Sequence, residues 1–349
     1  MTQPSHVTGP IGCYHYYHPQ LQTEIYLFSD QHGTNDHHYC PHASPISTLI
    51  SGIIQDHPQL HFDVVLESPV LMTGGIEQTP DLYSHRSFIQ DVVIELEQCL
   101  ISLSAHRASN DDRQRGRACR RPNLTVHPCD FRINRPIDLW YRLLELLGEG
   151  YSQATPLELL LTDLTSIRRQ LQQIVNNSQN TLSPLQLIAQ LYGVGQVITE
   201  QYQWVERSLR VTIEEFLRSR LDHLIVGGSN EIITSLLRFE KQLSTEINKG
   251  KQAVVKLSWR VREQLADELR SYIEAETWLL EYYSFARMFS TYEGRGRPHN
   301  IIYYAGYYHT ESTRDLLEWL GFEELAAVES SAQCLPLTQL HPWFPLNNK

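Results

Sequence analysis

Short apolar segments alternate with helical periodicity along the first third of the chain. Residues 24–29 (EIYLFS), 61–67 (HFDVVLE) and 123–128 (NLTVHP) have the length and the aliphatic and aromatic content of buried strands. Between them, residues 45–55 and 87–104 carry apolar side chains at the three- and four-residue spacing of a helix that covers a sheet. This alternation predicts an α/β fold with a mostly parallel sheet and helical crossovers.

The pattern changes after residue 135, where helical spacing continues without a convincing strand. Capping boxes at 155–158 (TPLE) and 183–186 (SPLQ) predict two helix starts, and the pair Gly227-Gly228 predicts a break between helices. We therefore expect a large all-helical insertion within the α/β core. The predicted parts are a first part of the core, 1–135, the insertion, 136–293, and the remainder of the core with a tail, 294–349.

The core returns near the carboxyl end of the chain. Residues 300–305 (NIIYYA) predict another buried strand, 313–320 predict a helix that stops at Gly321, and 324–330 predict a short last strand. The Pro-containing tail, 335–349, is expected to pack along the surface.

The chain is acidic, with a formal net charge of -11 over 349 residues. Because attraction to phosphates needs a basic surface, we expect no nucleic-acid partner, and the Arg-rich segment 107–121 is interpreted as an exposed loop. The sequence shows no basic start followed by an apolar stretch and no run as long as a bilayer span. A cytoplasmic protein without a membrane partner is therefore predicted. None of the six cysteines lies in a C-x-x-C pair, so we expect reduced thiols.

Polar side chains follow the end of each predicted parallel strand. In an open parallel sheet, ligands bind outside the carboxyl ends of the strands, so these side chains are expected to meet at one site. They are of the types that transfer protons or bind metals. The set is Asp30 and His32, Glu67, Asp130 and Arg132, and His309.

These residues also have a purely structural interpretation. In it, Asp30 only caps a helix from a surface loop, although Gly33 permits a tight turn that would bring the backbone close to a ligand, and Glu67 forms a salt bridge to a loop arginine. Asp130 and Arg132 then form an ion pair that shapes their loop instead of orienting a substrate anion.

Further histidines cluster near the start of the chain at spacings that match no zinc pattern. We interpret them as members of a solvated, aromatic-rich loop: His15, His18, His37, His38 and His42.

Several of these motifs together resemble a known superfamily. The segments 25–33 (IYLFSDQHG), 63–68 (DVVLES), 130–132 (D-x-R) and 300–322 (NIIYYAGYYHTESTRDLLEWLGF) are similar to those of the group that unites Tiki/TraB proteins, erythromycin esterases and ChaN-type haem-uptake proteins. Those proteins share a G-E-x-H-like turn, a second-strand Glu and a late G-x-x-H before a helix that ends in Gly-Phe. The resemblance covers about residues 24–132 and 298–330, and chains of this pattern are also associated with large DNA viruses.

The resemblance implies a parallel sheet and a hydrolase that acts on a small-molecule or peptide substrate. His32 would be the general base, Asp30 and Glu67 would orient it or bind a metal, and His309 would be a second base or ligand. Arg132, beside Asp130, would steady an oxyanion. Ser29-Asp30 stands where Gly-Glu is usual, which shortens the carboxylate.

Two alternatives stay open. Ser29-Asp30-x-His32-Gly33 is also similar to the first motif of calcineurin-like metallophosphoesterases, in which Asp30, His32 and His309 would bind a divalent transition metal such as Mn, Zn or Fe. No G-N-H motif accompanies it. The other alternative is a non-catalytic structural or interaction protein on the same fold, with the helical insertion as the surface for a protein partner.

Overall fold

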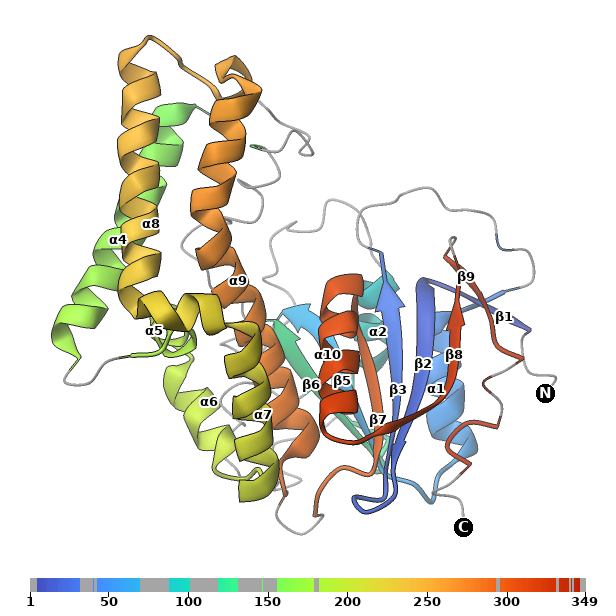
Figure 1. The fold of residues 1–349 in the computed structure, drawn as a ribbon. Coiled ribbons are helices and arrows are strands. Elements are labelled where there is room, and N and C mark those ends of the chain that lie inside the picture. Colours follow the sequence, from blue (N-terminus) through green and yellow to red (C-terminus); the bar gives the residue numbers. More distant parts are fainter. Residues whose placement is uncertain are drawn as a thin grey trace. The chain divides into compact units, whose positions relative to one another are not determined.

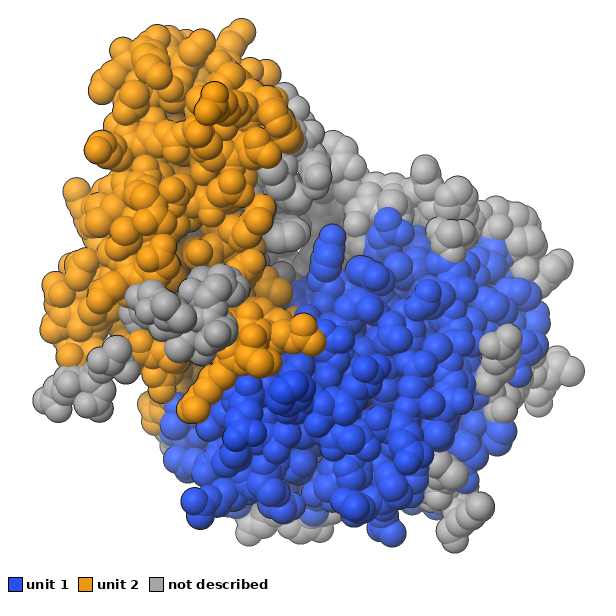
Figure 2. Space-filling model, in the orientation of Figure 1, with its two compact units in different colours: residues 1–131, 199–216, 283–349 blue, residues 132–198, 217–282 orange. Residues whose placement is uncertain are grey.

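The computed structural model describes residues 5–31, 40, 43–69, 88–100, 119–130, 146, 156–178, 182–292, 296–330, 333–338, 340 and 342–345. Contacts between residues divide the chain into two compact units (Figure 2). The first unit comprises 1–131, 199–216 and 283–349, and the second comprises 132–198 and 217–282.

A six-stranded sheet forms the centre of the first unit. Its strands lie in the order β6 (Leu124–Asp130), β5 (Phe62–Pro69), β7 (Asn300–Gly306), β3 (Thr23–Asp30), β2 (Pro10–His18) and β8 (Glu323–Glu329). Strands β6, β5, β7 and β3 are parallel to one another, whereas β2 runs antiparallel to both β3 and β8. The predicted α/β class with a mostly parallel sheet is confirmed, and β2 is a strand that the sequence pattern did not predict.

Helices cover both faces of this sheet (Figure 1). Helix α1 (Ile46–Asp56) and helix α2 (Phe88–Leu96), which a 3-10 turn (Glu97–Cys99) extends, lie on one face, and α10 (Tyr307–Trp319) lies on the other. Helix α10 begins immediately after β7, six residues before the predicted start at Thr313.

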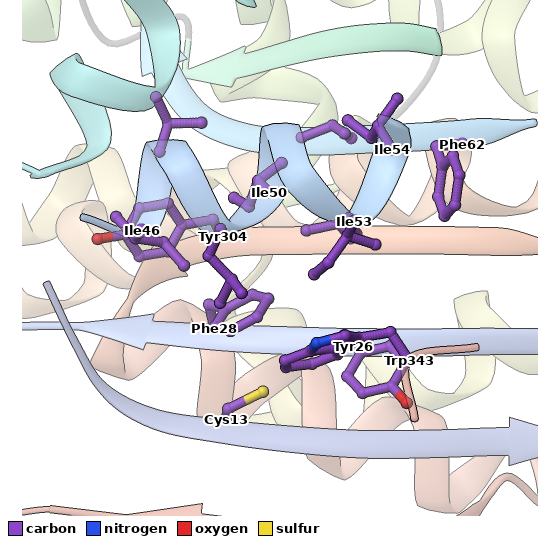
Figure 3. Close-up of a cluster of buried hydrophobic side chains, with 14 of the residues drawn as sticks. Cys13, Tyr26, Phe28, Ile46, Ile50, Ile53, Ile54, Phe62, Tyr304 and Trp343 are labelled. Atoms are coloured by element: carbon purple, nitrogen blue, oxygen red, sulfur yellow. The ribbon is translucent and has the colours of Figure 1, made fainter. Parts of the chain in front are cut away.

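The main hydrophobic core fills the space between the sheet and α1 (Figure 3). Alternate residues of β3 and β7, such as Tyr26, Phe28 and Tyr304, meet Ile50 and Ile53 of α1 there. Burying an aliphatic or aromatic side chain of this size contributes about 1.5–3 kcal/mol, so this layer holds the strands in register.

The carboxyl-terminal tail belongs to the same core. Strand β9 (Cys334–Pro336) pairs with β1 (His6–Thr8), which also pairs with β4 (Ser44–Pro45) in a small second sheet. Beyond β9, Trp343 and Phe344 are buried against Tyr26. The prediction of a surface tail is therefore wrong, because its apolar residues cover one edge of the core.

Between β6 and β7, the elements within the described ranges are helical apart from isolated bridges. They are α4 (Leu157–Asn177), α5 (Pro184–Leu191), α6 (Gly195–Tyr202), α7 (Arg207–Arg220), α8 (Asp222–Asn248), a 3-10 turn (Val254–Lys256) and α9 (Trp259–Phe289).

The capping predictions for these helices have mixed outcomes. Helix α5 starts at the predicted capping box of Ser183 and Gln186, whereas α4 starts after Pro156 without a side-chain cap. Helix α8 continues through Gly227 and Gly228, so the predicted break is wrong. Each glycine costs a helix only about 1 kcal/mol, and contacts of α8 with α4 and α5 support this helix. The boundaries 136–293 of the insertion stay a prediction.

Four of the six cysteines form disulfides, so the expectation of reduced thiols is wrong for them. Cys40 pairs with Cys334, and Cys99 pairs with Cys119. Cys13 and Cys129 are free and buried. Sequence spacing could not reveal these pairs, because their members lie 294 and 20 residues apart.

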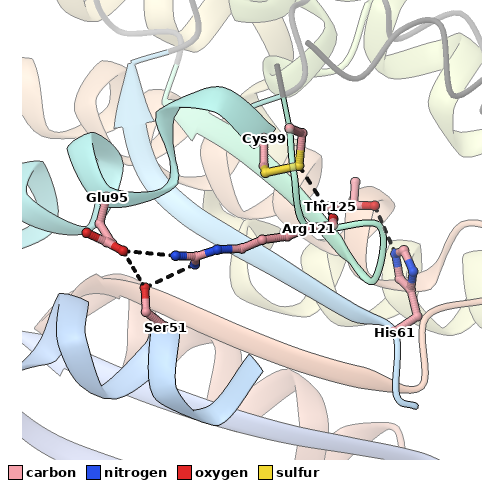
Figure 4. Close-up of a disulfide and its surroundings, with 7 residues drawn as sticks. Ser51, His61, Glu95, Cys99, Arg121 and Thr125 are labelled. Atoms are coloured by element: carbon pink, nitrogen blue, oxygen red, sulfur yellow. Dashed lines mark hydrogen bonds and ion pairs between the residues drawn. A yellow bond between two sulfur atoms is a disulfide. The ribbon is translucent and has the colours of Figure 1, made fainter. Parts of the chain in front are cut away.

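The Cys99–Cys119 disulfide lies beside a polar contact that ties β6 to the helices (Figure 4). Arg121 donates to Ser51 Oγ at 3.0 Å and to Glu95 Oε1 at 2.9 Å, and Ser51 donates to the same carboxylate oxygen. These bonds anchor the start of β6 against α1 and α2.

Candidate functional site

The four parallel strands end at one edge of the sheet, as the sequence pattern predicts. Asp30 of β3 lies opposite Gly306 of β7, and Pro69 of β5 lies opposite Asp130 of β6. The carboxyl ends of parallel strands are where ligands bind in open α/β sheets. We call this edge, with Glu67 and His309, the carboxyl edge.

Glu67 and His309 contact each other at the carboxyl edge. His309 Nε2 lies 3.2 Å from Glu67 Oε1, and the two side chains are only 8% and 4% exposed. The second carboxylate oxygen, Glu67 Oε2, accepts a hydrogen bond from the Gly306 backbone N–H at 2.7 Å. One carboxylate thus contacts the imidazole and also fixes the backbone from which α10, and with it His309, begins.

The local sequence of β5 explains the position of Glu67. Leu66 pairs with Pro128 and Pro69 with Asp130, so β5 has an extra residue between these pairs. An irregularity of this kind redirects side chains at the end of a strand. Glu67 comes just after the last pair between β5 and β7, Leu66 with Tyr304, and its carboxylate provides the acceptor for the N–H of Gly306.

Helix α10 holds His309 in its first turn. Gly306 is the N-cap residue, and no side chain caps the helix there. The Thr310 hydroxyl donates to the carbonyl oxygens of Ala305 and Gly306, and Thr313 donates to that of His309 at 2.8 Å. These buried bonds fix the backbone that carries the imidazole.

Asp30 is buried at the end of β3, on the face that also carries Tyr26 and Phe28. Gln333 donates to Asp30 Oδ1 at 3.4 Å and to the Gln31 carbonyl oxygen at 3.2 Å. Burial raises the pKa of Tyr304 well above its ordinary value, and the nearby Asp30 carboxylate adds to this shift. Asp30 therefore lies at the edge of the main core.

Asp130 ends β6 and is buried. Strands β5 and β7 lie between β6 and β3, so Asp130 and Asp30 flank the Glu67–His309 pair in the order of the strands. His32 and Arg132 lie outside the described residues, as do His37, His38 and His42.

Two of the clustered histidines correct the prediction of a solvated loop. His15 and His18 are buried in β2. His15 Nε2 lies 2.8 Å from Glu24 Oε1, and its ring stacks on Tyr26. His18 Nδ1 accepts a hydrogen bond from the Leu21 N–H. Both are explained as satisfied structural histidines.

A divalent metal was predicted on Asp30, His32 and His309. Within the described ranges, no group of three or more His, Cys, Asp or Glu residues is arranged to hold a metal ion. His32, the third predicted ligand, lies outside those ranges, so the metal site stays a prediction.

Sequence reasoning missed the Gly306 N–H and Gln333 as parts of this edge. They bond to Glu67 and Asp30 across 239 and 303 residues of chain. The late Gly-x-x-His motif marks Gly306, but no local pattern marks Gln333.

The comparisons with known proteins add no relative. No family model matches the sequence, and neither a curated protein nor a solved structure matches it significantly.

Proposed function

We propose that the protein is a hydrolase that cleaves an ester or amide bond of a small molecule or peptide, with His309 as a general base that Glu67 orients. The observation that carries this proposal is the buried contact of 3.2 Å between Glu67 Oε1 and His309 Nε2 at the carboxyl edge. A carboxylate that orients an imidazole is a recurrent device for proton transfer. The motif resemblance to erythromycin esterases and Tiki/TraB proteins also supports it.

The contact suggests which nitrogen of His309 is the base. Because the Glu67 carboxylate lies 3.2 Å from Nε2, a proton on Nε2 would be favoured, which leaves Nδ1 as the basic nitrogen. Nδ1 would take a proton from water as the water oxygen attacks the carbonyl carbon. The imidazole would then return that proton to the leaving alcohol or amine, while the bond between the carbonyl carbon and the leaving group breaks.

The other predicted residues have supporting roles in this proposal. His32 would be a second base, and Arg132, two residues after Asp130 in the sequence, would stabilise the oxyanion by charge-assisted hydrogen bonds. In an alternative form of the site, a divalent metal held by Asp30, His32 and His309 would supply a more acidic water, and His309 would then be a ligand instead of the base.

The remaining predictions concern the surroundings of the enzyme. Residues 136–293 are proposed as a helical insertion that offers a surface to a protein partner. In the part of the chain that the structure describes, no helix is long and apolar enough to cross a bilayer. A cytoplasmic location stays a prediction, and the two disulfides are more typical of an oxidising compartment.

The proposal is tested by screening chromogenic esters and peptides with the wild type, His309→Gln and the control His6→Gln. His6 lies in β1 and bonds to its neighbour Ser5. We expect kcat/KM to fall about 100-fold or more in His309→Gln, with no change in the control. Full activity of His309→Gln would refute the assigned base.

Two other outcomes would support the alternatives. Turnover of phosphoesters alone, together with stoichiometric Mn, Fe or Zn in elemental analysis, would favour the metallophosphoesterase. An absence of turnover for all three substrate classes would favour the non-catalytic protein.

A further inference from the structure

A polar pocket lies at the opposite, amino-terminal edge of the same strands. Its volume is about 290 Å³, near the lower limit for small-ligand pockets. The residues that carry the argument come from the turn after β2, the start of β5, and the segments that precede β5 and β7. They are Gln22, Gln59, His61, Asp63, Arg297 and His299.

The floor of this pocket is held by buried polar contacts. Asp63 Oδ1 lies 2.8 Å from His127 Nε2, and both residues are almost fully buried. Asp63 also interacts electrostatically with the buried guanidinium of Arg287. Burial lowers the pKa of Arg287, whereas Tyr292 and Asp63 favour its charged form. The Asp63 carboxylate in the floor therefore contacts one imidazole, that of His127, and interacts with one guanidinium, that of Arg287.

The side of the pocket is also fixed in place. His61 Nε2 lies 3.0 Å from Thr125 Oγ1, and the Asn300 amide donates to the His61 carbonyl oxygen. His299 Nδ1 lies 2.9 Å from the Gln22 carbonyl oxygen. The two imidazoles are thus positioned before any ligand arrives.

Arg297 has hydrogen-bonding capacity that the described residues leave unused. One terminal nitrogen donates to the Leu21 carbonyl oxygen at 3.1 Å, and the other lies 3.7 Å from the exposed Glu206 carboxylate. Its Nε is buried and has no partner among the described residues. The terminal nitrogen beside Glu206 forms no hydrogen bond among the described residues, because 3.7 Å exceeds hydrogen-bond distance, so it can donate to an acceptor that occupies the pocket.

We propose that this amino-edge pocket binds a small oxyanion, of the class of phosphate monoesters and short carboxylates. A guanidinium recognises such oxygens by charge-assisted, often paired hydrogen bonds. His61 and His299, together with the amides of Gln22 and Gln59, add polar groups suited to the remaining oxygens. The volume admits one phosphate with a small organic group.

The pocket is separate from the carboxyl edge. Asp63 and Glu67 are four residues apart on β5, or about 13 Å at about 3.3 Å per residue. Binding at the pocket therefore does not depend on the proposed hydrolase activity, and variants at one edge serve as controls for the other.

Isothermal titration of the full-length protein with inorganic phosphate, and separately with acetate, tests the proposal. Two variants change the pocket. Arg297→Gln removes its guanidinium, and Gln59→Glu adds a negative charge at its exposed rim. Arg270→Gln removes the same charge from an exposed arginine of the second unit, and Glu67→Gln alters the carboxyl edge.

We expect saturable binding of at least one anion, weakened about tenfold or more by Arg297→Gln and by Gln59→Glu, and unchanged in both controls. Tighter binding of phosphate or of acetate would identify which member of the class fits. The proposal is overturned if neither anion saturates, or if Arg297→Gln and Gln59→Glu bind like the wild type. Loss of binding in Glu67→Gln alone would overturn it too, because the anion would then bind at the carboxyl edge.

Discussion

Removing the Glu67 carboxylate should destabilise the first unit, because it leaves a buried backbone donor without its acceptor. In Glu67→Ala the Gly306 N–H loses its bond of 2.7 Å, and an unsatisfied buried donor costs about 1–3 kcal/mol. The variant also removes the contact with His309 and part of the packing at the carboxyl edge, so we expect a total loss of about 2–4 kcal/mol.

Glu67→Gln separates the two roles of this side chain. The amide oxygen still accepts from Gly306, but the amide group then presents a donor toward His309, so we expect a loss of only about 1 kcal/mol. The matched control is Glu323→Gln on the exposed surface of β8, for which the change should stay within about 0.5 kcal/mol.

Urea denaturation gives the free energies of unfolding. The slope of this free energy against urea concentration shows whether the variants expose the same surface area on unfolding. Amide hydrogen exchange gives a direct second measurement, because Gly306 should lose protection in Glu67→Ala and keep it in Glu67→Gln. If Glu67→Ala costs no more than the Glu323→Gln control and Gly306 stays protected, the carboxylate does not hold this backbone and the reasoning is wrong.

The other predictions concern buried thiols and a buried hydroxyl. Burial raises the pKa of Cys13 and raises that of Cys129 to about 12, so neither thiol should react with a disulfide reagent in the native protein at neutral pH. Titration in denaturant should count two thiols before reduction and six after it, and six before reduction would refute both disulfides. Tyr304→Phe removes a buried hydroxyl that has no hydrogen-bond partner among the described residues. Its free energy of unfolding should therefore stay equal or rise by up to about 1 kcal/mol. Tyr14→Phe removes the hydrogen bond to Glu329 and should lose about 1 kcal/mol. A lower thermal stability for Tyr304→Phe than for Tyr14→Phe would contradict both expectations.

The parallel strands could be predicted because a strand buried on both faces is a continuous apolar run. Strands β3, β5, β6 and β7 have this pattern and lie within two residues of their predicted bounds. Strand β2 was missed because its histidines suggest solvent exposure, whereas Glu24 of the neighbouring β3 provides the partner of His15. That partner becomes visible only when the pairing of the strands is known.

The candidate site was predictable only to the level of the sheet edge. The rule that ligands bind at the carboxyl ends of strands brings Glu67 and His309 to the same edge, and the structure places them in contact. The rule does not tell which face of the sheet each side chain occupies. Asp30 lies on the face of Phe28 and is held by Gln333, a contact across 303 residues that no local pattern could reveal.

The central claim is that Glu67 and His309 act as one catalytic unit. The most direct measurement is a double-mutant cycle on kcat/KM, with Glu67→Gln, His309→Gln and the double variant assayed on the best substrate of the screen. Residues that act as a unit are strongly non-additive, so the double variant should be no slower than His309→Gln alone, which we expect to lose about 100-fold or more. Independent losses that multiply in the double variant, or a fully active His309→Gln, would contradict the account.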